Sequence, residues 1–255
     1  MTKNSRPPRF EFTGSCFGFN NRGAGAIKTL LLLLALCSGF VPSIVAGEQQ
    51  TLFNGADLTG WEGDTKVWRV ADGVITAGSL TEKFPHNDFL VTVKSFHNFD
   101  LRLKFKLTGT EGFVNAGVQF RSVRVPKSFE MSGYQADIGA GYTGMLYDES
   151  RRNTFVAKLR DATALKAALK SNDWNEYRIR ACGSRIQLWV NGVHTVDYTE
   201  RDADIAQDGF IGLQIHGNGK TVIQYKDIVI EELPPTPDAP TWEKLGGYKP
   251  RPRKK

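Results

Sequence analysis

The sequence predicts an all-β sandwich or barrel, and three observations support this fold class. Between Thr51 and Leu233, apolar and polar residues alternate with a period of two, as in strands that bury one face. Turn residues interrupt the alternation every eight to twelve positions, a spacing typical of sandwiches and barrels. Asn191-Gly192 is a strong hairpin signal, because a type I′ turn needs positive φ at both central positions.

The clearest strand is expected at 101–107, where four apolar residues alternate with Arg102, Lys104 and Lys106. One segment, 161–170, has helical spacing, with Asp161 as its N-cap, and is expected to be a short surface helix. The other expected strands are 67–70, 73–77, 88–94, 114–123, 133–138, 154–159, 174–181, 185–198, 209–216 and 222–232.

Residues 1–46 have the features of a secretory signal peptide. Five basic residues precede the apolar run 29–41, and small residues follow at 44–46. We therefore expect a secreted or periplasmic protein with no stable membrane span after cleavage, since the run is shorter than the ~20 residues that a span needs. A lipoprotein anchor at Cys37 is the less favoured alternative, because Leu36 is too large for the position before a lipidated cysteine.

One domain is expected over 47–233, followed by a Pro-rich basic tail at 234–255. The tail is expected to be extended and poorly ordered, serving solubility or, as the weaker alternative, binding a cell wall or polyanion. The sequence pI of about 9.2 comes from the two ends, because 22 Lys and Arg face 24 Asp and Glu between residues 47 and 233. No nucleic-acid partner is therefore expected.

Three of the expected strands carry pairs of directional polar groups on one face. The pairs are Gln119 with Arg121, Gln135 with Asp137, and Gln214 with His216, each about 7 Å apart along its strand. If the three strands share a sheet, these six side chains form one polar surface suited to sugar hydroxyls. A solvated face held by cross-strand pairs is the alternative.

A glycine-rich segment at 139–153 follows the second of these strands. Its glycines permit tight turns, and it ends in a cluster of charged and aromatic residues. We expect this cluster at the rim of the polar surface, where it would bind substrate: Tyr147, Asp148, Glu149, Arg151 and Arg152.

Ordered sequence blocks over about residues 50–233 resemble the 3-keto-disaccharide hydrolase family. The resemblance implies a concanavalin A-like jelly roll of two antiparallel sheets. It also implies a carbohydrate partner, since some members cleave glycosides whose sugar is oxidised to a ketone at carbon 3. The blocks are LFNGADLTGW, GVITAG, NAGVQFRS, GYQADIG, TGMLYDESRRN, DWNEYRIRACG, the NGV hairpin, GFIGLQIHG and YKDIVIEEL.

The reaction that the resemblance implies needs a base, an acid and a donor to an enolate oxygen. His216 is the first candidate for base or acid, with Asp137 as competitor and Arg121 as the group that stabilises the enolate. Gln119, Gln135 and Gln214 would bind hydroxyls. A buried histidine bonded to a loop carbonyl is the alternative for His216.

No cofactor or metal is expected, because the chain lacks a P-loop, a dinucleotide fingerprint, zinc spacing and a G-x-S-x-G motif. A carbohydrate-binding module without activity, or an adhesion or scaffold domain, would use the same fold. Both remain alternatives to the enzyme.

Overall fold

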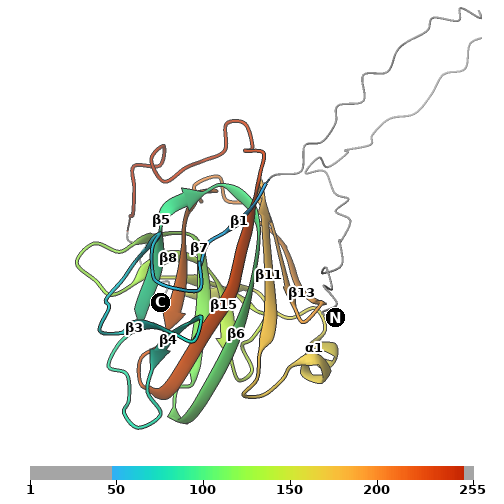
Figure 1. Cartoon of the computed structure of the whole chain (residues 1–255). Helices are drawn as coiled ribbons and strands as arrows, with labels where there is room; N and C mark the ends of the chain where they lie inside the picture. The colour runs from blue at the N-terminus through green and yellow to red at the C-terminus, as the bar shows by residue number, and fades with distance from the viewer. Residues whose placement is uncertain (1–47, 250–255) are drawn as a thin grey trace, which may run out of the picture. The chain divides into compact units, whose positions relative to one another are not determined.

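The computed structural model describes residues 48–249, which form an antiparallel β-sandwich (Figure 1). The predicted signal peptide and the last six residues of the tail lie outside the described residues. Within them, the one helix is α1 (Ala162–Ala168). The strands are β1 (Gln49–Thr51), β2 (Trp61–Glu62), β3 (Trp68–Ala71), β4 (Val74–Gly78), β5 (Asp88–Phe96), β6 (Asn98–Gly112), β7 (Asn115–Arg124), β8 (Met131–Gly139), β9 (Leu146–Glu149), β10 (Thr154–Ala157), β11 (Asn175–Cys182), β12 (Arg185–Val190), β13 (Val193–Thr199), β14 (Gly209–Ile215) and β15 (Gly219–Leu233).

The strands form two sheets, which confirms the predicted jelly-roll sandwich. The first sheet has the order β13-β12-β11-β6-β15-β4-β3, with β1 added against β15. The second has the order β10-β9-β8-β7-β14-β5-β2. Strands that are distant in sequence, such as β7 and β14, are therefore neighbours in the second sheet.

The core lies between the two sheets and follows from the period-two pattern. Leu101, Leu103 and Phe105 of β6 are buried on the inner side of the first sheet, and Val118 and Phe120 of β7 are buried opposite them. The rings of Phe99 and Phe120 meet edge to face at 6.1 Å across the sandwich. Alternation thus directs the apolar set of each strand into one shared core.

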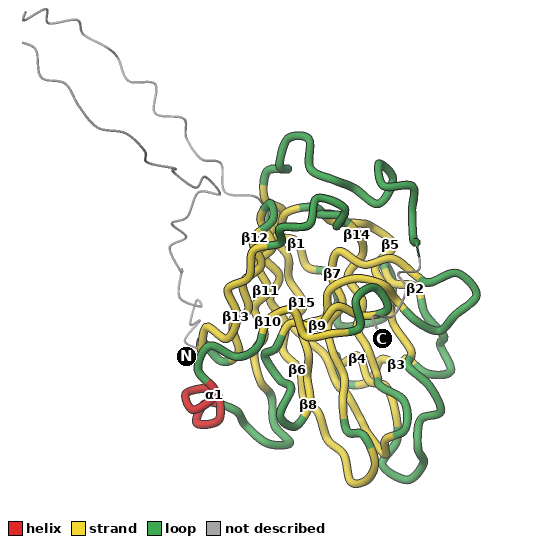
Figure 2. The backbone as a smooth tube through the Cα atoms, turned by 180° about the vertical axis from the view of Figure 1, so that it is seen from behind, coloured by secondary structure: helices red, strands yellow, loops and turns green. Residues whose placement is uncertain are grey.

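Local signals identified the hairpin and the helix correctly. Asn191 and Gly192 both have positive φ (47° and 81°) in the turn between β12 and β13. The Asp161 carboxylate accepts the backbone N–H of Ala164 at 2.8 Å, which caps α1. The helix lies beside β13 at the edge of the first sheet (Figures 1 and 2). No helix in residues 48–249 has the length and apolar character that crossing a bilayer requires.

The segment after Leu233 packs against the sandwich, so the prediction of an extended, poorly ordered tail is wrong for residues 234–249. The backbone N–H of Gln207 donates to the Pro240 carbonyl at 2.8 Å, and that of Trp242 donates to the Asp208 carboxylate at 2.8 Å. Figure 1 shows the segment leaving the end of β15 and crossing to the side of β5. Proline keeps this segment out of a sheet, but its carbonyls still accept hydrogen bonds.

Candidate functional site

The second sheet has one face on the core and an opposite face that we call the polar face. The register places Gln214, Gly117 and Asp137 in one row across β14, β7 and β8. Gln119 and Gln135 lie opposite each other in the next row. These two rows therefore contain four of the six side chains that the sequence pattern grouped, and His216 follows Gln214 at the end of β14, where its backbone N–H donates to the Asn115 carbonyl.

A chain of hydrogen bonds connects the polar groups of β7 and β8. Ser122 Oγ donates to Gln119 Oε1 at 2.8 Å, and Gln119 Nε2 donates to Gln135 Oε1 at 2.9 Å. Gln135 in turn hydrogen-bonds Asp137, whose Oδ1 also accepts Asn115 Nδ2 at 2.8 Å. Gln119 is fully buried, and both its amide oxygen and its amide nitrogen are hydrogen-bonded within this series. It orients its neighbours instead of presenting a free group to a sugar.

Gln214 differs from the other glutamines, because neither its amide nitrogen nor its amide oxygen has a hydrogen-bond partner. Only Gly117 separates it from Asp137 in the row across the sheet. A Cβ at Gly117 would lie 2.6 Å from Cδ of Gln135, so glycine there lets the Gln135 side chain lie across the row. A buried amide without a partner costs free energy, and Gln214 is fully buried, so its amide lies beneath the surface of the polar face.

Part of the polar face is apolar. Phe89, Val91 and Met131 form a small buried cluster, with Phe210 packed against it. A Cβ at Gly212 would lie 2.7 Å from Met131 Sδ, which places the Met131 side chain over the middle of the sheet. The polar groups are therefore concentrated on the β7, β8 and β9 side.

Two carboxyl groups on the polar side have raised pKa values. Burial raises the pKa of Asp137 to about 6, and its hydrogen bonds from Asn115 and Gln135 oppose the rise. Burial, and then the charge of Glu130, raise the pKa of Glu149 to about 7, with Asp137 contributing further. Both pKa values are raised toward neutrality, so these two carboxyls can exchange protons near neutral pH.

His216 lies at the end of β14 with its ring in an aromatic wall. Its Nδ1 lies 2.8 Å from the Gly217 carbonyl, so Nδ1 carries the proton and Nε2 is the basic nitrogen. The ring packs edge-on against Phe113 at 4.6 Å. Tyr142 joins this wall through Phe113 and stacks on Phe155 at 5.6 Å. The histidine is half-buried and bonded to a loop carbonyl, which agrees with the alternative hypothesis of a structural histidine.

The loops before β5 and before β8 are joined to each other. His86 stacks on Phe129 with ring centroids 3.7 Å apart. Asn87 Nδ2 donates to Glu130 Oε1 at 3.0 Å, and the Asn87 side-chain oxygen accepts the Gly217 N–H. This link brings Glu130 close enough to Glu149 to raise its pKa.

The structure contradicts the prediction that Arg121 shares a face with Gln119. A bulge interrupts the register of β7 and β8 after Phe120, and Arg121 has φ of 49°. The guanidinium therefore leaves the polar face and donates to the carbonyls of His97 and Gly183 and to Asn98 Oδ1, at 3.1, 2.7 and 3.0 Å. Burial lowers its pKa to about 10, so it stays charged at neutral pH. With these contacts Arg121 is a structural residue.

The predicted rim residues divide between the two faces of β9. Tyr147 and Glu149 alternate onto the polar face, where Tyr147 lies opposite Gln135. Asp148 is fully buried on the other side and forms ion pairs with Arg151 and Arg152. Arg152 also pairs with Glu200 at 2.8 Å. The charged cluster is thus largely a buried ion network, and the rim prediction fails for Asp148, Arg151 and Arg152.

Two residues important to this site were missed by the sequence reasoning. Asn115 holds Asp137, and alternation along β7 puts it on the same face as Gln119, so this signal was available. Glu130 lies in the loop between β7 and β8, and its charge raises the pKa of Glu149 on β9. The two residues come close only when the strands pair, so no sequence pattern identified Glu130.

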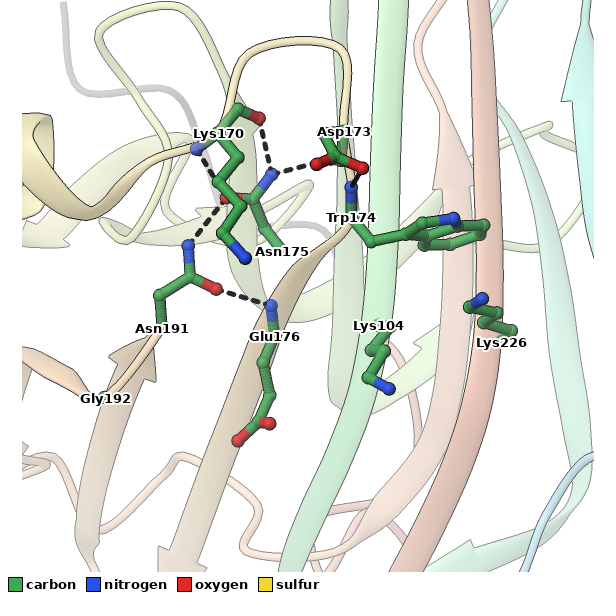
Figure 3. Close-up of a pocket in the computed structure, with 9 residues that line it drawn as sticks. All are labelled: Lys104, Lys170, Asp173, Trp174, Asn175, Glu176, Asn191, Gly192 and Lys226. Atoms are coloured by element: carbon green, nitrogen blue, oxygen red, sulfur yellow. Dashed lines mark hydrogen bonds between the residues drawn. The ribbon is translucent and has the colours of Figure 1, made fainter.

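A cavity of about 440 Å³ lies on the opposite, first sheet, around Trp174 (Figure 3). Its asparagines, Asn175 and Asn191, bond to each other and to backbone groups of Lys170 and Glu176. Lys104 pairs with Asp227, and Lys226 Nζ sits 4.2 Å from the Trp174 ring centroid. The two asparagines therefore join the turn between β12 and β13 to the start of β11.

Within residues 48–249, no group of three or more His, Cys, Asp or Glu side chains is arranged to hold a metal ion.

Comparisons with known proteins agree with this fold. The model of one family, described as the 3-keto-alpha-glucoside-1,2-lyase-like domain, matches residues 48–231. A candidate glycosyl hydrolase from Parabacteroides distasonis is 21% identical, with 74% of this chain and 94% of that chain covered and a TM-score of 0.57. A second from the same organism is 22% identical, covering 73% and 100%, with a TM-score of 0.54.

A carbohydrate-binding module of Bacillus subtilis, CBM66, has the same fold. It is 15% identical, with 68% of this chain and 96% of that chain covered and a TM-score of 0.52. A search of curated proteins finds no match. At these identities the likenesses to solved structures establish the fold alone.

Proposed function

Because the chain belongs to the 3-keto-alpha-glucoside-1,2-lyase-like domain family, we propose that it cleaves the glycosidic bond of 3-keto-glycosides at the polar face. The observation that carries the proposal is the placement of two largely buried carboxyls, Asp137 and Glu149, on this face, where burial raises both pKa values toward neutrality. A proton abstraction followed by departure of an alcohol uses one such group as base and one as acid.

The proposed reaction is an elimination. The ketone at carbon 3 acidifies the hydrogen on carbon 2, and a base removes this proton while its electron pair forms the enolate. Collapse of the enolate makes the double bond between carbons 1 and 2 and breaks the bond from carbon 1 to the glycosidic oxygen. That oxygen takes a proton and leaves as an alcohol. Addition of water to the double bond then gives the free 3-keto sugar.

We assign the base to Asp137 and the acid to Glu149. Asp137 is buried, ionised at neutral pH and held by Asn115 and Gln135, so its carboxylate is oriented and poorly solvated. Burial raises the pKa of Glu149 to about 7, so this carboxyl can hold a proton near neutral pH. His216, at the end of the face, is the alternative base through Nε2.

The donor to the enolate oxygen in this proposal is not Arg121, whose guanidinium is engaged elsewhere. Gln214 lies in the same row as Asp137, but it is fully buried and does not reach a bound sugar.

A carbohydrate-binding module without activity is the second candidate. The displacement of Arg121 from the polar face favours it, because binding of a neutral sugar needs no cation, whereas an enolate benefits from one. Amide and carboxyl groups of the kind present here also bind sugar hydroxyls. The apolar part of the face would suit an adhesion or scaffold domain. Such a domain would not need the hydrogen-bonded series of polar side chains beside it.

The two candidates are separated by incubating the protein with a 4-nitrophenyl 3-keto-glucoside and with its unoxidised parent. The lyase proposal expects release of nitrophenol from the oxidised compound alone, and loss of that release in Asp137→Asn. Asp197→Asn, which alters an ion pair on the first sheet, is the matched control and should keep full activity.

Exchange of the hydrogen on carbon 2 in deuterated water gives an independent measure of the first step. Exchange without release would locate the defect in the acid step. Saturable binding with neither exchange nor release would reject the lyase and support the binding module.

A further inference from the structure

A connected series of aromatic rings borders one end of the polar face. Phe113 packs edge-on against His216 at 4.6 Å and against Tyr142 at 6.0 Å. Tyr142 stacks on Phe155 at 5.6 Å, and Phe155 meets Tyr147 edge to face at 5.0 Å. These five residues form the aromatic wall. They come from five different parts of the sandwich, so only the fold brings them together.

The aromatic wall lies on the same side of the second sheet as the polar groups. At one limit, His216 follows Gln214 by two positions, and alternation points both side chains to the polar face. At the other limit, Phe155 of β10 lies opposite Tyr147 of β9 in the register. Tyr147 in turn lies opposite Gln135. The wall therefore runs from the end of β14 to β10.

Two turns carry the middle of the wall to the level of Asp137. Phe113 lies in the turn between β6 and β7, two residues before Asn115, whose side chain donates to Asp137. Tyr142 lies in the turn between β8 and β9, where its backbone N–H donates to the Gly139 carbonyl at 3.0 Å. Gly139 faces Asn115 in the register, so both turns stand next to the row that contains Asp137.

The rings of the wall are accessible to a ligand. Phe113 is 41% exposed, and the other four residues of the wall are half-buried. Phe113 makes angles of 73° with the ring of His216 and 62° with that of Tyr142. Rings at such angles form a corner in which a flat group can contact one face and one edge. Covering the exposed phenylalanine would remove apolar surface from water, which is favourable.

We propose that the aromatic wall binds a planar, apolar leaving group, so that the preferred substrates are aryl glycosides. The inference rests on the proposed function, because it takes the sugar to lie over the polar groups with carbon 2 at Asp137. The glycosidic oxygen is attached to the neighbouring carbon 1. The leaving group therefore begins close to Asp137, at the end of the face that the wall borders.

A second sugar is a poorer occupant of the wall. Its hydroxyl groups lie around the whole ring and need hydrogen-bond partners when they leave water. The wall offers the hydroxyls of Tyr142 and Tyr147 and the imidazole of His216, and its remaining side-chain surface is ring carbon. An aryl group contacts ring carbon without leaving hydroxyls unpaired.

Equilibrium titration of the full chain with three α-glucosides tests the inference. The probes are phenyl α-glucoside, methyl α-glucoside and trehalose, which share the α-glucosyl unit named by the family description and differ in the leaving group. None has a ketone at carbon 3, so binding is measured without cleavage. We expect phenyl α-glucoside to bind at least tenfold more tightly than the other two, because its aryl group is removed from water.

Three results would overturn the inference. They are equal affinities for the phenyl and methyl glucosides, binding of trehalose as tight as that of the phenyl glucoside, and no binding of the phenyl glucoside.

Variants connect the preference to the wall. Phe113→Ala should weaken binding of the phenyl glucoside at least fivefold and leave that of the methyl glucoside unchanged, whereas general damage to the fold would weaken both. Phe113→Tyr keeps the ring and should keep the preference. Val93→Ala, at an exposed apolar residue of β5 outside the wall, is the control and should bind both probes as the parent does. A phenyl preference that survives both Phe113→Ala and Tyr142→Ala would place the aryl group elsewhere.

The titrations and the cleavage assay distinguish this inference from the proposed function. If phenyl and methyl 3-keto-glucosides are cleaved but the titrations show no phenyl preference, the lyase stands and the inference is wrong. If the phenyl preference depends on Phe113 but neither oxidised glucoside is cleaved, the lyase is wrong. The wall would then be the aryl-binding part of a carbohydrate-binding module.

Discussion

Asn115 and Asp137 are joined across β7 and β8 by a hydrogen bond of 2.8 Å from Nδ2 to Oδ1. The bond depends on a glycine, because a Cβ at Gly139 would lie 2.6 Å from Asn115 Nδ2. Gly139 faces Asn115 in the register of the two strands. The absence of a side chain there leaves space for the asparagine to reach the carboxylate.

We expect Asn115→Ala to raise the pKa of Asp137 further above its present value of about 6. The asparagine stabilises the ionised form, so its loss leaves burial less opposed. If Asp137 is the base, the acid limb of the pH profile of kcat/KM moves to higher pH, and activity at pH 6 falls several-fold. Asn54→Ala, in an exposed turn, is the control. An unmoved acid limb in Asn115→Ala would exclude Asp137 as the base.

Glu149→Gln should stabilise the protein at pH 8 and leave it unchanged at pH 4. The folded-state pKa of about 7 lies above the ordinary value of 4.5, so the carboxyl is neutral in both states at low pH. As pH rises, the unfolded chain ionises first, and the folded state loses stability relative to it. The gain at pH 8 is about 2–3 kcal/mol, measured by urea unfolding. Equal effects at both pH values would contradict the burial of this group.

Glu200→Gln should act in the opposite direction. Its ion pair with Arg152 and its bond from Tyr134 hold the pKa of Glu200 down to about 2 against the effect of burial. The carboxylate therefore stabilises the fold above its unfolded pKa, and this stability disappears as pH falls toward 2. The variant should be less stable than the parent at pH 7, and the two unfolding curves should converge at low pH. A constant difference down to pH 2 would count against the ion pair.

Arg121→Lys should destabilise the fold by about 3–5 kcal/mol. Lysine cannot satisfy two backbone carbonyls and the Asn98 oxygen together, as the guanidinium does. Arg124→Lys, on the same strand but exposed, is the matched control and should change the free energy of unfolding by less than about 1 kcal/mol. If the Arg121→Lys protein were as stable as the parent but inactive, Arg121 would have a role in the reaction and not only in the fold.

Trp242→Ala should loosen the C-terminal segment from the sandwich. The indole N–H donates to the Arg121 carbonyl at 3.3 Å, and the ring lies against the Arg151 guanidinium. We expect a loss of about 1–3 kcal/mol for this half-buried ring and faster hydrogen exchange of the Gln207 amide, which bonds Pro240. Unchanged protection of that amide would show that the segment is held without Trp242.

Local chemistry explains what the sequence predicted correctly. The alternation of β6, the Asn191-Gly192 turn and the Asp161 cap each depend on residues adjacent in the chain. Side-chain direction in a strand, positive φ in a turn and capping of a first helical turn are all short-range effects. The residues of such segments were enough to predict strands of a sandwich or barrel, one hairpin and one helix, whereas the two antiparallel sheets were implied by the family resemblance.

The same alternation failed where the backbone departed from a regular strand. At Arg121 a bulge with positive φ turned the side chain away from the polar face. In the charged cluster alternation held: it put Glu149 and Asp148 on opposite faces of β9, although the prediction had placed both at one rim. The sequence contains no strong signal for the bulge, because its position depends on how β7 pairs with β8 and β14.

The sequence by itself determined the period-two strands, the grouping of Gln119, Gln135, Asp137 and Gln214 by type, and the family resemblance. Only the tertiary structure decided that β14, β7 and β8 lie side by side, that Glu130 reaches Glu149, and that the C-terminal segment packs against Arg151. Those relationships join residues far apart in the chain. Packing of the whole sandwich fixes them, because no local interaction favours one such pairing over another.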